Sequence, residues 1–194
     1  MKAEASAATT SVSQALSKGT CPICVILKDY QWTLATTAQA AHDLRLCNFH
    51  CWSLARSRGS GFSRSTPGET VTNVFLQMLK GPLLGKVAAE DCDLCHRVLE
   101  EETVRLRELA KKFQSAMFSQ WLKSQGTLCV DHARKLKEFV PLRYRKTIDE
   151  VVERNRAELV EELEAFSEQV RHGIHEGGGL LGRVAEFLVG QRGL

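Results

Sequence analysis

The sequence has little of what marks a membrane protein, a secreted protein or a familiar enzyme. No apolar run approaches the roughly 20 residues that a transmembrane helix needs. The first residues, MKAEASAATTSVSQALSKG, hold one early lysine but no continuous apolar stretch, so they do not resemble a secretory signal. No glycine-rich phosphate loop, serine nucleophile motif or pair of catalytic carboxylates is found. We therefore expect a cytoplasmic, non-enzymatic protein, with residues 1–19 as a mobile leader that forms at most one helical turn, near Val12 to Leu16.

Proline and net charge are scarce as well. The chain has only 4 prolines in 194 residues, and its apolar residues recur mostly at helical spacing, which favours an all-α fold. A formal net charge of +3 permits contact with nucleic acid or an acidic partner but demands neither. With 43% hydrophobic and 25% charged residues, the composition is that of a globular protein. We expect one helical domain over residues 20–190.

Cysteine, by contrast, is plentiful, and its surroundings repeat. CPICVIL is followed by LCNFHCWSL, and CDLCHRVL is followed later by LCVDHARKL. Each copy is a C-x-x-C and then an L-C-x-x-H, which indicates an internal duplication. We place repeat one at residues 20–80, repeat two at 91–140, and a long helix with a tail at 142–190. Only Cys51 of the 7 cysteines falls outside the repeated pattern.

Three thiols and one imidazole in each copy match a tetrahedral Cys3His zinc shell. Metal ligation is also the more frequent use of cysteine clusters in a cytosolic chain, where disulfides are rare. Two four-ligand sets would be closed and therefore structural rather than catalytic. We expect each copy to bind its own zinc ion, the first through Cys21, Cys24, Cys47 and His50, the second through Cys92, Cys95, Cys129 and His132.

The intervals between the half-motifs suggest how the chain returns to the metal. There are 22 residues between Cys24 and Cys47, and 33 between Cys95 and Cys129. Both are longer than a usual finger loop, so we expect a helical hairpin in each copy with the metal at its mouth. In the second copy, one helical stripe is expected through Val98, Leu99, Leu106, Leu109, Phe113, Met117 and Trp121.

A long helix is expected from Arg143 to about His172, lying across both hairpins, with a coiled-coil seam as the alternative. Gly177 to Gly179 are expected to end it, and LLGRVAEFLVG to form a short terminal helix.

In order along the chain, CPICVILKDY, LCNFHCWSL, CDLCHRVLEEE, GTLCVDHARKL and RHGIHEGGGLLGRVAEFLVG resemble an uncharacterised bacterial family known as a domain of unknown function. The resemblance covers about residues 20–190 and implies a helical, metal-binding bacterial protein without a known activity. The first copy departs from the second in the loop before its third cysteine, where Asp43, Leu44 and Arg45 stand in place of Gly126. All eight ligand positions match.

Two other functions remain open from the sequence. Cysteine-rich sets with one histidine can hold iron–sulfur clusters for electron transfer or redox sensing. A basic cluster beside Trp121 and Tyr144 could contact the phosphates of nucleic acid, through Arg134, Lys135, Lys137, Arg143, Arg145 and Lys146. For the main hypothesis, a zinc-binding scaffold, we expect a protein partner. Cys51 and His96 have no assigned role; His96 completes a C-x-x-C-H, but its counterpart in the first copy is Val25, which argues against haem attachment.

Overall fold

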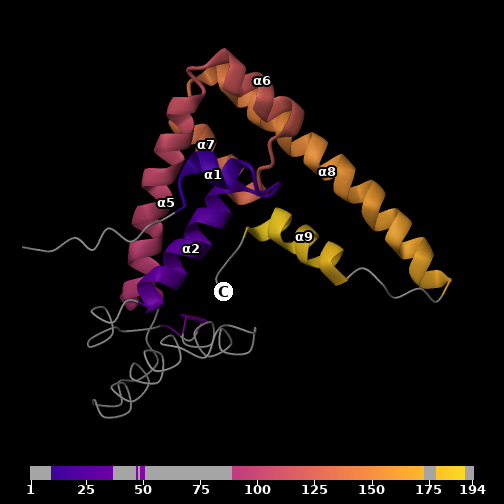
Figure 1. The fold of residues 1–194 in the computed structure, drawn as a ribbon, viewed down its shortest axis with the longest axis horizontal. Coiled ribbons are helices and arrows are strands. Elements are labelled where there is room, and N and C mark those ends of the chain that lie inside the picture. Colours follow the sequence, from indigo (N-terminus) through magenta and orange to yellow (C-terminus); the bar gives the residue numbers. More distant parts are fainter. Residues whose placement is uncertain (1–9, 37–46, 48, 51–88, 173–177, 191–194) are drawn as a thin grey trace, which may run out of the picture. The chain divides into compact units, whose positions relative to one another are not determined.

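The computed structural model describes residues 10–36, 47, 49–50, 89–172 and 178–190, and within these ranges every regular element is a helix. The all-α prediction is confirmed. No helix in the described part of the chain is long and apolar enough to span a bilayer. The helices are α1 (Val12–Leu16), α2 (Pro22–Thr36), the short 3-10 helix η2 (Ala89–Asp91), α5 (Asp93–Lys112), α6 (Ala116–Gln125), α7 (Val130–Phe139), α8 (Leu142–Arg171) and α9 (Gly178–Val189) (Figure 1).

The chain forms two compact units that do not coincide with the two sequence repeats. Unit 1 comprises Met1–Thr10, Ile26–Thr103 and Gly193–Leu194, and unit 2 comprises Ser11–Val25 and Val104–Arg192. The C-x-x-C of the first copy therefore belongs to unit 2, together with the C-x-x-H of the second copy. The chain passes from one unit to the other within α2 and within α5.

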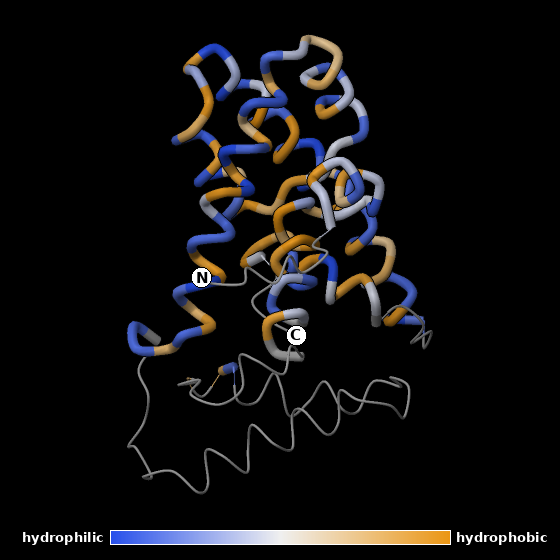
Figure 2. Tube along the Cα trace, turned by 60° about the vertical axis from the view of Figure 1, so that its left-hand side comes forward, coloured by the Kyte–Doolittle hydropathy of each residue, from blue (hydrophilic) through white to orange (hydrophobic). Residues whose placement is uncertain are grey.

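Unit 2 is a helical bundle built around the first half of α8. Helix α8 packs against α6 and α7, and α9 packs against α7 and α8. Apolar residues gather where the helices face one another and polar residues lie outside (Figure 2). The fully buried side chains of this core include Leu109, Phe113, Leu122, Leu128, Leu136, Ile148 and Val151.

The stripe expected from Val98 to Trp121 is not one helix. Helix α5 ends at Lys112, and Ser115 caps α6 by accepting a hydrogen bond from the backbone N–H of Phe118. A serine at this position satisfies a backbone donor that the start of a helix leaves free. Two members of the expected stripe are exposed, Leu99 at 59% and Met117 at 81%. The helical spacing of apolar residues continues across the turn between the two helices because α5 and α6 each have an apolar face.

The long helix is present where the sequence predicts it. Helix α8 covers Leu142–Arg171, and its buried residues all fall in its first half: Thr147, Ile148, Val151 and Asn155. In unit 2, α8 contacts α6, α7 and α9. The coiled-coil alternative stays a prediction.

The predicted turn near the start of the chain is α1. Its Val12 and Ala15 are buried, and Lys112 donates a hydrogen bond to the hydroxyl of Ser13 at 3.1 Å. Ser11 and Gln14 form a reciprocal capping box at its first turn. This part of the expected leader therefore packs within unit 2.

Candidate metal centres

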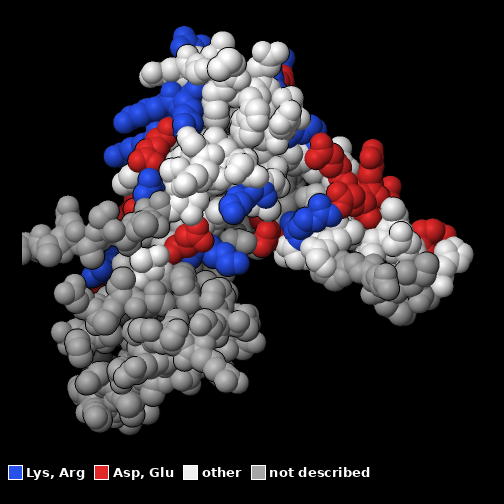
Figure 3. Space-filling model, viewed as in Figure 1, with Lys and Arg blue, Asp and Glu red and all other residues white. Residues whose placement is uncertain are grey.

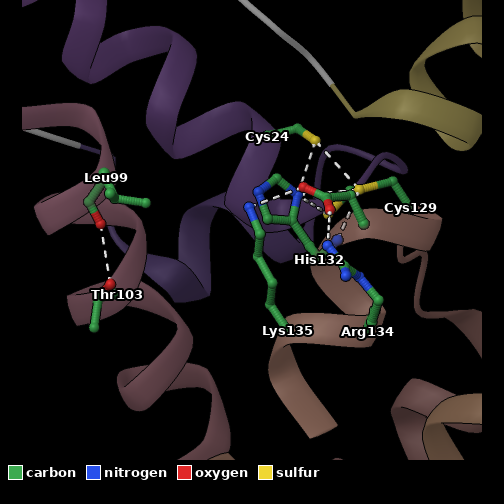
Figure 4. A network of polar contacts seen from close by, with 9 residues as sticks. Cys24, Leu99, Thr103, Cys129, His132, Arg134 and Lys135 are labelled. Carbon is green, nitrogen blue, oxygen red and sulfur yellow. Dashed lines mark hydrogen bonds and ion pairs between the residues drawn. The ribbon is translucent and has the colours of Figure 1, made fainter. Parts of the chain in front are cut away.

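The eight predicted ligands form two compact clusters. The first, which we call the outer cluster because its halves are the first and last half-motifs of the chain, lies in unit 2. Its three sulfurs lie near the Nδ1 atom of His132, at 3.5 Å from Cys21, 3.3 Å from Cys24 and 3.0 Å from Cys129. Figure 4 shows Cys24 and Cys129 beside His132. All four side chains are buried.

The second, or inner, cluster is built from the two middle half-motifs and lies in unit 1. Here the sulfurs surround the Nδ1 atom of His50, at 3.4 Å from Cys47, 3.3 Å from Cys92 and 3.4 Å from Cys95. Three of the four side chains are buried, and Cys95 is half-buried. The two clusters therefore share one arrangement, three thiols around one imidazole nitrogen.

The predicted pairing of the half-motifs is wrong. We expected each copy to complete its own site, but each cluster combines the C-x-x-C of one copy with the C-x-x-H of the other. The outer cluster joins Cys21 and Cys24 to Cys129 and His132, whereas the inner cluster joins Cys92 and Cys95 to Cys47 and His50. Metal ions in these clusters would not staple two separate hairpins, because the sites are nested along the chain.

The sequence does not reveal this nesting. The ligand spacing within the half-motifs is the same in both copies, C-x-x-C and C-x-x-H, so either C-x-x-H could complete either C-x-x-C.

The ligand atoms fit a single tetrahedral ion. With zinc–sulfur bonds of about 2.3 Å, tetrahedral angles place two sulfurs roughly 3.8 Å apart. The sulfurs of Cys24 and Cys129 are 3.7 Å apart, and those of Cys47 and Cys95 are 3.8 Å apart. The same bond lengths place sulfur and nitrogen roughly 3.5 Å apart, close to the 3.0–3.5 Å in both clusters. Each set could therefore hold one ion.

Local sequence positions the ligands of the outer cluster. Cys129 is the N-cap of α7, and its sulfur accepts a hydrogen bond from the backbone N–H of His132 at 3.5 Å. One turn of helix thus places both ligands on the same side. Cys21 and Cys24 flank the start of α2, where Pro22 occupies the first helical position and needs no backbone hydrogen bond.

The thiols of each cluster affect one another's ionisation. In the outer cluster, burial opposes ionisation of Cys21, but hydrogen bonds from Cys129, Cys24 and His132 outweigh it and hold the pKa of Cys21 well below the usual range. Hydrogen bonds to Cys129 and Cys21, with burial, raise the pKa of Cys24. These pKa shifts favour the thiolate at Cys21 and the protonated thiol at Cys24. A metal ion that binds all three sulfurs would displace the remaining protons.

The inner cluster behaves in the same way. Burial opposes ionisation of Cys92, but backbone hydrogen bonds from Cys47 and Cys95 lower its pKa, whereas burial and the two neighbouring thiols raise the pKa of Cys95 to about 12. Burial also lowers the pKa of His50. That shift favours the neutral imidazole, which is the form that binds metals.

A residue that the sequence analysis missed covers the outer cluster. Gly190 follows α9 with φ +71°, and a Cβ built on it would lie 3.6 Å from the sulfur of Cys129, 3.8 Å from that of Cys24 and 3.9 Å from a ring carbon of His132. The backbone at the end of α9 therefore rests directly on the ligands. The sequence shows a glycine after the terminal helix, which signals a helix end, but not what that end touches.

The remaining candidates are not ligands of these clusters or lie outside the described residues. Cys51 falls outside them. His96 is exposed and hydrogen-bonds through Nε2 to the backbone carbonyl of Glu90. Three members of the basic cluster are engaged with carboxylates: Arg134 and Lys135 with Asp131, and Lys137 with Asp149.

Asp131 in turn stands next to a metal ligand. Burial opposes its ionisation, but hydrogen bonds from Lys135 and Arg134 lower its pKa, so it stays a carboxylate beside His132 (the two basic side chains are drawn in Figure 4). In the first turn of α7 this negative charge also interacts favourably with the positive end of the helix dipole.

Comparison with known proteins found no match: no protein-family model, no curated protein and no solved structure matches the chain.

Proposed function

We propose that the protein binds two zinc ions, one in each cluster, and that it acts as a non-enzymatic scaffold for a protein partner. The observation that carries the proposal is the convergence of all eight predicted ligands into two complete sets whose ligand atoms lie within 4.8 Å of one another. Three thiolates and one imidazole favour zinc. A closed set leaves no position for water or substrate, which is the mark of a structural site.

The zinc ions would contribute directly to folding. The outer cluster joins residues on either side of a long intervening chain, Cys24 and Cys129, and the inner cluster joins Cys47 to Cys92. Because such sites do not exist in the unfolded chain, the free energy of metal binding becomes free energy of folding.

A protein partner is favoured over nucleic acid. Half of the basic cluster that the sequence offered for phosphate contact forms ion pairs with Asp131 and Asp149. A nucleic-acid-binding protein would bind DNA or RNA at about 50 mM salt and lose it steeply as salt rises. We expect no binding under those conditions. The cytoplasmic location and the resemblance to the uncharacterised bacterial family stay predictions.

The deciding experiment is elemental analysis with a visible spectrum on full-length protein purified without air. We expect two zinc ions per chain and no colour. Cys129→Ser and Cys47→Ser should each retain one ion, and His96→Ala, the matched control next to Cys95, should retain two. Iron with a broad band near ~400 nm would replace the proposal with an iron–sulfur protein, and a chain without metal would overturn both.

A further inference from the structure

A pocket lies beside the outer cluster within unit 2. It has a volume of about 100 Å³, and its walls come from α8, from α9 and from the segments that carry the outer-cluster cysteines. At roughly 10–15 Å³ for each water-sized sphere, that volume holds roughly seven to ten non-hydrogen atoms of a ligand. Its residues include Cys21, Cys24, Cys129, Asn155, Glu158, Leu159, Glu162, Arg183, Glu186 and Phe187.

One buried polar group in the wall lacks a partner. Asn155 is only 4% exposed, and its Oδ1 accepts a hydrogen bond from the Arg154 guanidinium at 3.0 Å. That contact fixes which way the amide faces, because the opposite orientation would set two donors against each other. The Nδ2 atom has no hydrogen-bond partner among the described residues. A buried donor of this kind costs free energy unless an acceptor meets it, and Asn155 is one of the residues that line the pocket.

The charge of the pocket is negative. Glu158, Glu162 and Glu186 line it together with one cation, Arg183. Glu162 pairs with Arg183 and Glu158 pairs with Arg154 at 3.4 Å, so the carboxylates outnumber the guanidinium groups by one. The neighbouring part of α8 carries a concentration of acidic side chains (Figure 3). A zinc ion held by three thiolates and a neutral imidazole leaves one further negative charge on the adjoining wall. These groups favour a cation over an anion.

The rest of the wall is apolar. Leu159 of α8 and Phe187 of α9 both line the pocket, and Phe187 is 8% exposed. An alkyl chain would remove their remaining surface from water. Apolar walls with a few convergent polar groups are typical of small-molecule sites.

We propose that this pocket binds a small organic ammonium compound that also carries a hydroxyl or carbonyl oxygen. The ammonium group lies among the carboxylates, the oxygen accepts a hydrogen bond from Asn155 Nδ2, and the alkyl part contacts Leu159 and Phe187. The inference rests on the proposed metal function, because the end of α9, which supplies one wall, rests on the outer cluster through Gly190.

The test uses three probes of similar size on the zinc-loaded full chain: aminopentanol, pentanediol and hydroxypentanoate. They have about seven to eight non-hydrogen atoms, within the range that the pocket holds, and they carry a cationic, a neutral and an anionic end. Titration calorimetry and amide chemical shifts should show saturable binding of aminopentanol, with pentanediol at least about tenfold weaker and hydroxypentanoate not bound. Equal affinity for all three, or no saturable binding of aminopentanol, would overturn the proposal.

Two variants locate the binding. Glu158→Gln removes one carboxylate and should weaken aminopentanol binding about three- to tenfold. Asn155→Leu removes the amide and should weaken aminopentanol and pentanediol alike, because both lose the same hydrogen bond. The matched control is Glu168→Gln, which lies further along α8, pairs with Arg171 and does not line the pocket. Weakening by Glu168→Gln as large as by Glu158→Gln would place the binding elsewhere and refute the assignment.

Zinc analysis of the same samples separates the two proposals. Two bound ions without selective amine binding would overturn the pocket alone. A chain that binds no zinc would overturn the metal assignment and, with it, this inference. In Cys129→Ser, loss of the outer ion together with amine binding would support the dependence of the pocket on that cluster, and retained amine binding would contradict it.

Discussion

The outer and inner clusters use the same ligand types in nearly the same geometry, but they differ in what surrounds them. In the outer cluster all four ligands are buried, Gly190 lies over them and a pocket lies beside them. In the inner cluster Cys95 is half-buried, and the Nε2 atom of His50 has no hydrogen-bond partner among the described residues.

This difference shows that the ligand set and its surroundings have different origins in the sequence. The duplicated motif supplies an equivalent ligand set twice, whereas the single α8 and α9 follow only the second copy and belong to unit 2. Equal coordination therefore does not imply equal accessibility or an equal role.

Removing ligands in pairs gives the strongest test of which half-motifs share a cluster. Cys21→Ser with Cys129→Ser should leave one zinc ion per chain, because both residues belong to the outer cluster. Cys21→Ser with Cys47→Ser should leave none, because it damages both clusters. Native mass spectrometry counts the ions directly. If each copy completed its own site, the two results would be exchanged.

Chelation kinetics should show the difference in accessibility. With excess EDTA, we expect the inner ion to leave first, since Cys95 is half-buried and the outer ligands are covered by Gly190. Release followed with a zinc indicator dye should have two phases in the native protein. Cys129→Ser, which keeps the inner ion, should show only the fast phase, and Cys47→Ser only the slow phase. The reverse assignment would refute the idea that Gly190 protects the outer cluster.

Gly126→Ala should destabilise unit 2 just before the outer ligands. An added Cβ would lie 2.3 Å from Leu122 Cδ1 and 2.8 Å from the Leu122 carbonyl oxygen, so the backbone at the end of α6 must shift. We expect a loss of about 2 kcal/mol in the free energy of unfolding, measured with urea on zinc-loaded protein. Gly182→Ala is the matched control, because nothing lies within 4 Å of its added Cβ. It should be neutral or slightly stabilising.

Gly190→Ala is a smaller change that tests whether Gly190 covers the outer cluster. Its Cβ would make ordinary contacts with the ligands, but φ +71° is unfavourable for a residue other than glycine. We expect a loss of about 1 kcal/mol and faster release of the outer ion, with unchanged release of the inner ion. Equal acceleration at both sites would show that the glycine acts on overall stability and not on one cluster.

The smallest effect is expected at Asp131. Its carboxylate pairs with Arg134 at 3.1 Å and with Lys135 at 2.9 Å, and these partners lower its pKa. Because ion pairs that water still reaches contribute little, Asp131→Asn should cost only about 0.5 kcal/mol in unfolding free energy. Urea unfolding at low salt and at ~1 M salt should show the difference shrinking as the charges are screened. A loss of several kcal/mol would mean that Asp131 supports His132 itself.

Particular residues show how far the sequence predicted the structure. The spacing of C-x-x-C and C-x-x-H identified all eight cluster residues, and apolar periodicity located α8 to within one residue at each end. Periodicity failed at Met117, because it registers the spacing of apolar residues and not whether another helix covers them. Asn155 gave no signal, since a polar residue in a charged helix looks the same whether it faces water or a pocket.

What the sequence by itself determined is the all-helical fold and the chemistry of its two sets of thiols and imidazoles, because both follow from short-range patterns of residue type. Which half-motif meets which was decided only by the tertiary structure. The two copies carry half-motifs with the same ligands at the same spacing, so the sequence alone does not say which half meets which. The same is true of Gly190 and the pocket: each brings together residues from distant parts of the chain, which only the packing of α8 and α9 places side by side.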